Sequence, residues 1–159
     1  LALTPNERTV LVAFGGIPLT SLPLEHMEQL RPYRFIFDGP VPPGYSRIHS
    51  TKTLPFSFKA LIASVDVIMT KPGYGTIVEA VALQQPVVYV RRNNFADEPP
   101  LVDYLHRYGR GIELPVDDFT QCRWEAALQQ ALDTPVLSLP PPSNGAAEAA
   151  EVIVRHYKF

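Results

Sequence analysis

The chain is expected to form a single α/β domain, built on a doubly wound, mostly parallel sheet of about six strands. Two observations predict this fold. Short apolar segments alternate with segments of helical periodicity along the 159 residues, an order typical of parallel strands joined by helices. Residues 86–90 are moreover apolar throughout, as expected of a strand that helices cover on both faces.

The first elements follow from short local patterns. Residues 9–14 are rich in β-forming side chains and end at two glycines, which predicts a first strand. Apolar residues at every third position indicate a short helix over 24–30. Residues 33–37 form the next strand, closed by Asp38-Gly39. After a proline-rich turn, residues 47–51 are a weaker strand candidate.

The middle of the chain repeats this alternation. Residues 56–64 predict a short helix that leads into a strand at 65–70. A helix over 76–83 follows, and the apolar strand at 86–90 comes next.

The last third is predominantly helical. A helix over 99–108 places its large apolar residues on one face, and 121–132 does the same around Trp124. A short strand at 111–114 lies between them. Residues 135–143 hold three consecutive prolines and predict a stiff connector. A final helix over 145–157 follows, with Asn144 placed to cap it.

Composition limits the classes of function. The net charge of −2, with 19% charged residues, argues against broad binding to nucleic acid. No apolar run approaches the roughly 18 residues of a membrane span. Cys122 is the single cysteine, so no internal disulfide can form, and we expect a cytoplasmic protein. Because the chain begins at Leu1, we expect a processed product or a piece of a longer protein.

The most informative stretch is residues 66–80, DVIMTKPGYGTIVEA, which is typical of a strand, a glycine turn and a helix start. Gly73 and Gly75 leave room for a ligand beside the backbone, and the helix N-terminus suits a diphosphate. The pattern matches neither GxGxxG nor GxxxxGK[ST], so an ordinary nicotinamide enzyme and a Walker-type NTPase are disfavoured.

Two pairs of residues are expected at the edge of the sheet where the parallel strands have their carboxyl ends, and each pair has alternative interpretations. Gly15-Gly16 would let a substrate lie against backbone N–H groups, or would simply form a tight turn. Thr76 and Glu79 have the spacing of a capping box. The Glu79 carboxylate is also suited to accept hydrogen bonds from two ribose hydroxyls, and one role does not exclude the other.

Charged residues follow the strands predicted at 65–70 and 86–90, and they are therefore expected at the same carboxyl edge of the sheet. Lys71 is a candidate phosphate ligand or an ordinary loop lysine. Arg91 and Arg92 are candidates for a bidentate phosphate contact. Asp97 and Glu98 open the next helix, where they would meet sugar hydroxyls or only complement the helix dipole.

Other chemistries find no support in the pattern. The four histidines lack metal-ligand spacing, so no metal site is expected. No D-x-D and no G-x-S-x-G occur, which disfavours a transferase with a carboxylate-bound metal and an α/β-hydrolase. Cys122 has no basic partner in the sequence and is interpreted as structural. No catalytic residue is assigned.

The segments DVIMTKPGYGTIVEAVALQQPVVYVRR and VLVAFGG resemble the C-terminal, donor-binding half of GT-B glycosyltransferases, a Rossmann-like fold. The likeness is to the family 28-like branch, with its lipid-linked N-acetylglucosaminyltransferases and diacylglycerol glycosyltransferases. KPGYGTIVEA and VRRNNFADEPPL also resemble the glycosyltransferase-like segment of plant arabinose kinases.

The resemblance implies roles for residues at matching positions. Gly15 and Gly16 would border the diphosphate or the acceptor, Gly75 and Thr76 would meet the phosphates, and Glu79 would hold the ribose. Asp97 and Glu98 would lie at the donor sugar, with Glu98 in place of the family's Gln. Lys71 and Tyr74 are unusual for these transferases. The candidate site residues are therefore Gly15, Gly16, Lys71, Gly73, Tyr74, Gly75, Thr76, Glu79, Arg91, Arg92, Asp97 and Glu98.

The resulting expectation is a domain that binds a nucleotide-sugar, as UDP-sugar substrate without any cofactor, within a metal-independent hexosyltransferase. An N-terminal Rossmann-like domain of the same longer protein would supply the acceptor site and any catalytic base. Three alternatives stay open. One is a non-catalytic module that binds a sugar nucleotide or sugar phosphate and regulates an attached enzyme, and another is a protein-interaction domain that binds no nucleotide. The third is a sugar-nucleotide epimerase, which shares this architecture and would form UDP without any acceptor.

Overall fold

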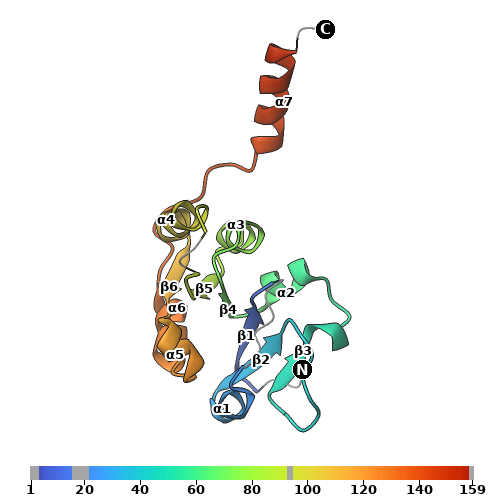
Figure 1. The fold of residues 1–159 in the computed structure, drawn as a ribbon, viewed down its shortest axis with the longest axis vertical. Coiled ribbons are helices and arrows are strands. Elements are labelled where there is room, and N and C mark those ends of the chain that lie inside the picture. The colour runs from blue at the N-terminus through green and yellow to red at the C-terminus, as the bar shows by residue number, and fades with distance from the viewer. Residues whose placement is uncertain (1–3, 16–21, 93–94, 158–159) are drawn as a thin grey trace.

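The computed structural model describes residues 4–15, 22–92 and 95–157. Within them, six parallel strands form one sheet in the order β3-β2-β1-β4-β5-β6 (Figure 1). The predicted α/β fold with a doubly wound parallel sheet is confirmed. The strands are β1 (Arg8–Ala13), β2 (Tyr33–Phe37), β3 (Ile48–Ser50), β4 (Val67–Thr70), β5 (Pro86–Tyr89) and β6 (Arg110–Glu113).

Helices cover both faces of the sheet. On one face, Met27 of α1 and Leu128 of α6 belong to the core that also includes α5. On the other face, Ile77 of α3 and Leu105 of α4 belong to a second core shared with α2. The helices are α1 (Leu24–Gln29), α2 (Phe58–Ser64), α3 (Tyr74–Ala82), α4 (Glu98–Tyr108), α5 (Val116–Thr120), α6 (Glu125–Asp133) and α7 (Gly145–His156), with a 3-10 turn at Thr51–Thr53.

The direction of winding reverses between β1 and β4. The chain moves outward through β2 and β3, then returns to the other side of β1 and continues through β4, β5 and β6. Ala13 pairs with Thr70, and Thr70 pairs with Tyr89, so β1, β4 and β5 end at the same edge. Ligands of doubly wound folds bind outside the carboxyl ends of the strands at such a reversal.

Side-chain hydrogen bonds fix the central pair of strands, β1 and β4, at both ends. At one end, the Asp66 carboxylate accepts hydrogen bonds from the Thr9 amide and hydroxyl, each at 2.8 Å. At the other end, the buried Thr70 hydroxyl donates to the Ala13 carbonyl oxygen at 2.6 Å. Because Thr70 is the last residue of β4, this bond sets the position of the turn that follows.

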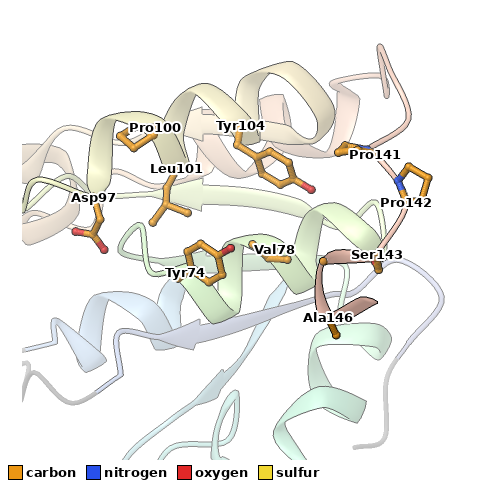
Figure 2. Close-up of a pocket in the computed structure, with 11 residues that line it drawn as sticks. Tyr74, Val78, Asp97, Pro100, Leu101, Tyr104, Pro141, Pro142, Ser143 and Ala146 are labelled. Carbon is orange, nitrogen blue, oxygen red and sulfur yellow. The ribbon is translucent and has the colours of Figure 1, made fainter. Parts of the chain in front are cut away.

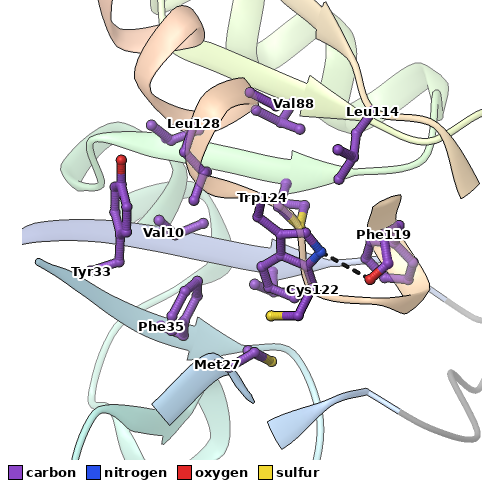
Figure 3. Packing of buried hydrophobic residues seen from close by; sticks show 14 of the residues in the cluster. Val10, Met27, Tyr33, Phe35, Val88, Leu114, Phe119, Cys122, Trp124 and Leu128 are labelled. Atoms are coloured by element: carbon purple, nitrogen blue, oxygen red, sulfur yellow. Dashed lines mark hydrogen bonds between the residues drawn. The ribbon is translucent and has the colours of Figure 1, made fainter. Parts of the chain in front are cut away.

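Trp124 anchors the core beneath α5 and α6 (Figure 3). Its ring stacks on Phe119 with centroids 5.4 Å apart and meets Phe35 of β2 edge-on at 5.7 Å. The indole Nε1 donates to the Phe119 carbonyl oxygen at 2.9 Å, which satisfies its one polar atom. Through Trp124, these contacts fix α5 relative to β2.

Some predicted boundaries need correction. The helix predicted over 121–132 begins only at Glu125, because Cys122 adopts a positive φ of 57° that interrupts the helical path. The short helix α5, just before it, was not predicted. The strand predicted from residue 65 begins at Val67, since Val65 ends α2 by donating to the Leu61 carbonyl.

The C-terminal segment follows the predicted outline. Residues 134–144 form no helix or strand, and α7 then extends away from the sheet (Figure 1). Asn144 lies at the predicted cap position, but its side chain caps nothing, and its backbone carbonyl accepts from the Ala147 and Glu148 amides at 2.9 and 3.0 Å. α7 has no buried residue. No helix in the described ranges is long and apolar enough to cross a membrane.

Candidate functional site

The N-terminus of α3 lies directly after β4, at the edge where the winding reverses. Gly73 is its N-cap, and no side chain caps the helix. The first hydrogen bond of the helix runs from the Ile77 amide to the Gly73 carbonyl oxygen at 3.0 Å. The amides of Tyr74, Gly75 and Thr76 therefore precede the helical ladder and are available to an anion.

This geometry corrects the predicted start of the helix. The helix was expected from Thr76, with Thr76 and Glu79 as a capping box. It begins at Tyr74, so Thr76 is the third residue of the helix and Glu79 the sixth. The capping box is therefore not formed, because neither residue stands at a capping position. The Glu79 carboxylate is thus not used in holding the helix end.

The glycines at this edge of the sheet have open space where a side chain would be. A Cβ built on Gly75 would meet no atom within 4 Å, and one on Gly73 would meet only the Lys71 carbonyl oxygen at 3.8 Å. Gly15 also faces open space and has a φ of +42°, which favours glycine there. Gly16, also expected at this site, lies outside the described residues.

Lys71 connects the turns that follow β1 and β4, the two strands between which the winding reverses. Its Nζ donates to the Gly15 carbonyl oxygen at 2.7 Å and so joins the turn after β4 to the turn after β1. Burial, followed by the nearby Arg92 guanidinium, lowers the pKa of Lys71. The ammonium has three donors, so two remain for an anion at the same edge.

Arg92 and Glu98 form a pair that closes the turn between β5 and α4. The Glu98 carboxylate is 3% exposed and accepts from the Arg92 amide at 3.0 Å and from its Nε at 3.4 Å. The Arg92 guanidinium also donates to the Pro72 carbonyl oxygen and lies over the Phe95 ring. Both side chains thus tie the turns after β4 and β5 together.

Arg91 belongs to a separate network on the same edge, which the sequence did not predict. Its Nε lies 2.9 Å from Glu113, and the Tyr89 hydroxyl donates to the same carboxylate at 3.2 Å. That hydroxyl also lies 2.8 Å from His106 Nε2. Burial, reinforced by Glu113, raises the pKa of Tyr89 to about 12. The spacing of 22 residues between Arg91 and Glu113 gives no local signal of this pairing.

The three basic residues expected at the edge share one hollow. Lys71, Arg91 and Arg92 line a cavity of about 270 Å³ together with aromatic and apolar side chains from the ends of β1 and α5. The Phe119 ring forms part of the cavity wall, and its centroid lies 5.0 Å from that of the Phe14 ring. The structure therefore brings these residues together, although each already has a protein partner.

A larger cavity of about 610 Å³ lies between α3 and α4 (Figure 2). Tyr74 and Val78 of α3 form one wall, and the first turns of α4 form the other. The proline connector and the start of α7 close the remaining side. Asp97, the exposed N-cap residue of α4, lies at one end of this cavity. The lining residues are Tyr74, Val78, Asp97, Pro100, Leu101, Tyr104, Pro141, Pro142, Ser143, Gly145 and Ala146.

In the ranges 4–15, 22–92 and 95–157, no three His, Cys, Asp or Glu side chains gather in a way that could hold a metal ion. The same edge carries groups that can receive an anion, namely the uncapped amides at the start of α3, open glycines and Lys71. Apolar and aromatic walls adjoin it on the side of α4.

Solved structures share this architecture. The chain aligns with MurG from Acinetobacter baumannii at a TM-score of 0.64 and 13% identity, covering 96% of this chain and 51% of that one. It aligns with the glycosyltransferase VinC in complex with dTDP at 0.63 and 18% identity, covering 95% and 43%. The fold is that of one half of a GT-B glycosyltransferase. The predicted resemblance to family 28-like GT-B proteins is thereby confirmed at the level of fold.

A comparison of sequences finds a relative that is much longer than this chain. The chain is 28% identical over 158 residues to L-arabinokinase from Arabidopsis thaliana, covering 96% of this chain and 14% of the relative. No protein-family model matches. The chain thus spans about half or less of the solved structures named above and a small part of the curated relative.

Proposed function

We propose that this domain binds a nucleotide-sugar, specifically a UDP-sugar, as the donor-binding part of a hexosyltransferase. The observation that supports this most is the uncapped N-terminus of α3, which lies at the winding reversal with open space at Gly75. Free amides and the positive end of the helix dipole attract a diphosphate, and Lys71 adds a positive charge beside them.

In this proposal the diphosphate accepts hydrogen bonds from the amides of Tyr74, Gly75 and Thr76. Glu79, released from any capping role, accepts hydrogen bonds from the ribose hydroxyls. As the sugar leaves, negative charge grows on the diphosphate, and the same amides and Lys71 stabilise it. The dTDP complex of VinC supports the choice of ligand class, because a nucleoside diphosphate binds to another protein of this fold.

The acceptor site and any catalytic base would come from an N-terminal Rossmann-like domain of the same longer protein. The coverage of the relatives supports this, since the chain matches only 38–51% of the first solved structures compared.

Calorimetric titration of the chain with UDP, GDP, ADP and dTDP tests the proposal. We expect UDP to bind most tightly, Glu79→Ala to weaken it, and Lys71→Met to weaken it and reduce its salt dependence. Glu25→Ala on α1, at an exposed position, is the matched control and should bind as the wild type does. If neither the chain nor the longer protein bound any of the four nucleotides, the proposal would be wrong.

A second candidate is a non-catalytic nucleotide-sugar module attached to another enzyme. The likeness to L-arabinokinase favours it, because that relative is named as a kinase and the chain spans 14% of it. The two candidates differ in the full-length protein. If the protein releases UDP from a UDP-sugar only when an acceptor is added, it is a transferase. If it binds the UDP-sugar without turnover, it is the non-catalytic module.

A further inference from the structure

The helix α7 exposes large apolar side chains. Val152, Ile153 and Tyr157 are 54%, 56% and 65% exposed, and the helix extends away from the sheet (Figure 1). Exposed apolar side chains that gather on one face mark a surface for association. The sequence of α7 itself indicates which partner fits this face.

The apolar face of α7 occupies about a quarter of the helix surface. Successive residues of an α-helix are rotated by roughly 100°, so four residues fall within one arc of about 100°. They are Ala149, Val152, Ile153 and His156. Val154 lies on the opposite side of the helix from the middle of this arc. We call these four residues the apolar arc.

The charges beside the apolar arc favour an antiparallel second copy as the partner. Glu148 and Arg155 border the arc on one side, at equal distances from the point midway between Glu151 and Val152. If two copies of α7 pack antiparallel about a two-fold axis through that point, Glu148 of each copy lies opposite Arg155 of the other. Within one copy, Arg155 lies 3.3 Å from Glu151, but both side chains are exposed and such a pair holds them weakly.

The same axis brings the end of one helix to the cavity between α3 and α4 of the other copy. Ala146 lines this cavity, and it lies as far from the axis as Tyr157, so Tyr157 of the second copy falls opposite Ala146 (Figure 2). Tyr74 and Tyr104 of the lining offer ring faces to a further aromatic side chain. Because α7 starts at the cavity and spans roughly 18 Å, the Tyr157 of the same chain ends far from it.

We propose that two copies of this chain associate through antiparallel packing of α7, with Tyr157 of each copy at the cavity of the other. Every contact is then made twice, as a two-fold interface requires. Two helices of twelve residues make a small interface, below the roughly 1,200 Å² of stable complexes, so we expect a dissociation constant on the order of 100 μM. At micromolar concentrations the chain is therefore a monomer with α7 exposed. The inference requires no nucleotide and is independent of the proposed function.

Sedimentation equilibrium of the chain between about 10 and 500 μM tests the proposal. We expect the average mass to rise with concentration from that of one chain towards that of two. Ile153→Asp places a charge within the apolar arc and should raise the dissociation constant at least about tenfold. Val154→Asp is the matched control, because it makes the same kind of change at the next residue, which is exposed on the opposite side of α7. This control should associate as the wild type does.

An exchange of charges tests the antiparallel arrangement itself. Glu148→Arg and Arg155→Glu each create like-charge pairs across the axis, so each variant alone should associate several-fold more weakly than the wild type. An equimolar mixture of the two variants restores both opposite-charge pairs in the mixed dimer and should recover the affinity of the wild type. Substitutions that only weakened the helix would show no recovery on mixing.

The outcomes decide the matter without reference to UDP. If the wild type stays monomeric at every concentration, the inference is overturned and α7 serves another partner. If Ile153→Asp leaves a dimer intact, or the mixed charge variants recover nothing, the copies associate in another way and the inference is likewise wrong. The proposed function is tested by UDP binding to the monomer, so it stands or falls separately.

Discussion

Replacing Gly75 by alanine separates the structural and the binding roles of the α3 N-terminus. Gly75 is the second residue of α3, and a Cβ there would meet no atom within 4 Å. The free domain therefore accommodates the added methyl group without a shift in its neighbours. In the proposed complex, the same methyl group would occupy the space through which a phosphate reaches the amides.

The two effects have opposite signs. Alanine is favoured over glycine inside a helix by about 1 kcal/mol, and roughly half of that is expected in the first turn. We therefore expect the free energy of unfolding to rise by about 0.5 kcal/mol, or roughly 1–2 °C in melting temperature. Loss of one amide contact to a charged phosphate costs about 1.5–3 kcal/mol, which weakens UDP binding by roughly ten- to hundredfold.

The assay pairs a thermal melt with a calorimetric titration of UDP on the same sample. Ala82→Gly is the matched control, because it makes the reverse change at an exposed position near the other end of α3. This control should lower the melting temperature and leave UDP affinity unchanged.

Either of two results would refute the reasoning about Gly75. A clear loss of stability in Gly75→Ala would mean that the space around the residue is not free. Unchanged UDP affinity, with UDP bound to the wild type, would mean that the phosphates do not approach the helix at this residue.

Three further predictions concern stability. Glu98→Ala leaves the Arg92 guanidinium without its mostly buried partner and should lower the free energy of unfolding by about 2–3 kcal/mol in urea titrations. The Thr4 amide, with a nearby arginine, lowers the pKa of Glu7 to about 2, so the stability that Glu7 confers is present above pH 4.5 and lost as the pH falls towards 2. Urea midpoints measured between pH 5 and 2 should therefore fall less steeply for Glu7→Gln than for the wild type. Because burial raises the pKa of Tyr89 to about 12, stability should decline between pH 10 and 12, and a Tyr89→Phe variant that declines equally would contradict this assignment.

The order of strands and helices could be predicted because short segments rich in apolar residues alternate along the chain with segments of helical periodicity. The buried strand β5 and the helix α4 show this most clearly, since periodicity and burial agree there. The start of α3 was predicted two residues too late, because Thr76 and Glu79 have the spacing of a capping box. In the structure Gly73 is the N-cap and the helix begins at Tyr74. α5 was missed because its five residues are too few for a helical period.

The pairing of the charged side chains at the candidate site was harder to predict. The sequence places Lys71, Arg91 and Arg92 at the correct edge, because that follows from where the strands end. It does not indicate that Arg92 is held by Glu98, or that Arg91 is held by Glu113 across two strands. These pairings depend on the register of neighbouring elements, which no local pattern encodes.

The isolation of α7 has a consequence for how the chain melts. α7 has twelve residues, none of them buried, and a helix of this length in water lies near the limit of stability. Its helicity should fade gradually on heating, while the body around the sheet unfolds in one cooperative step. Far-ultraviolet circular dichroism should therefore show a sloping loss of signal before the main transition, and ending the chain after residue 134 should remove the slope without moving the midpoint.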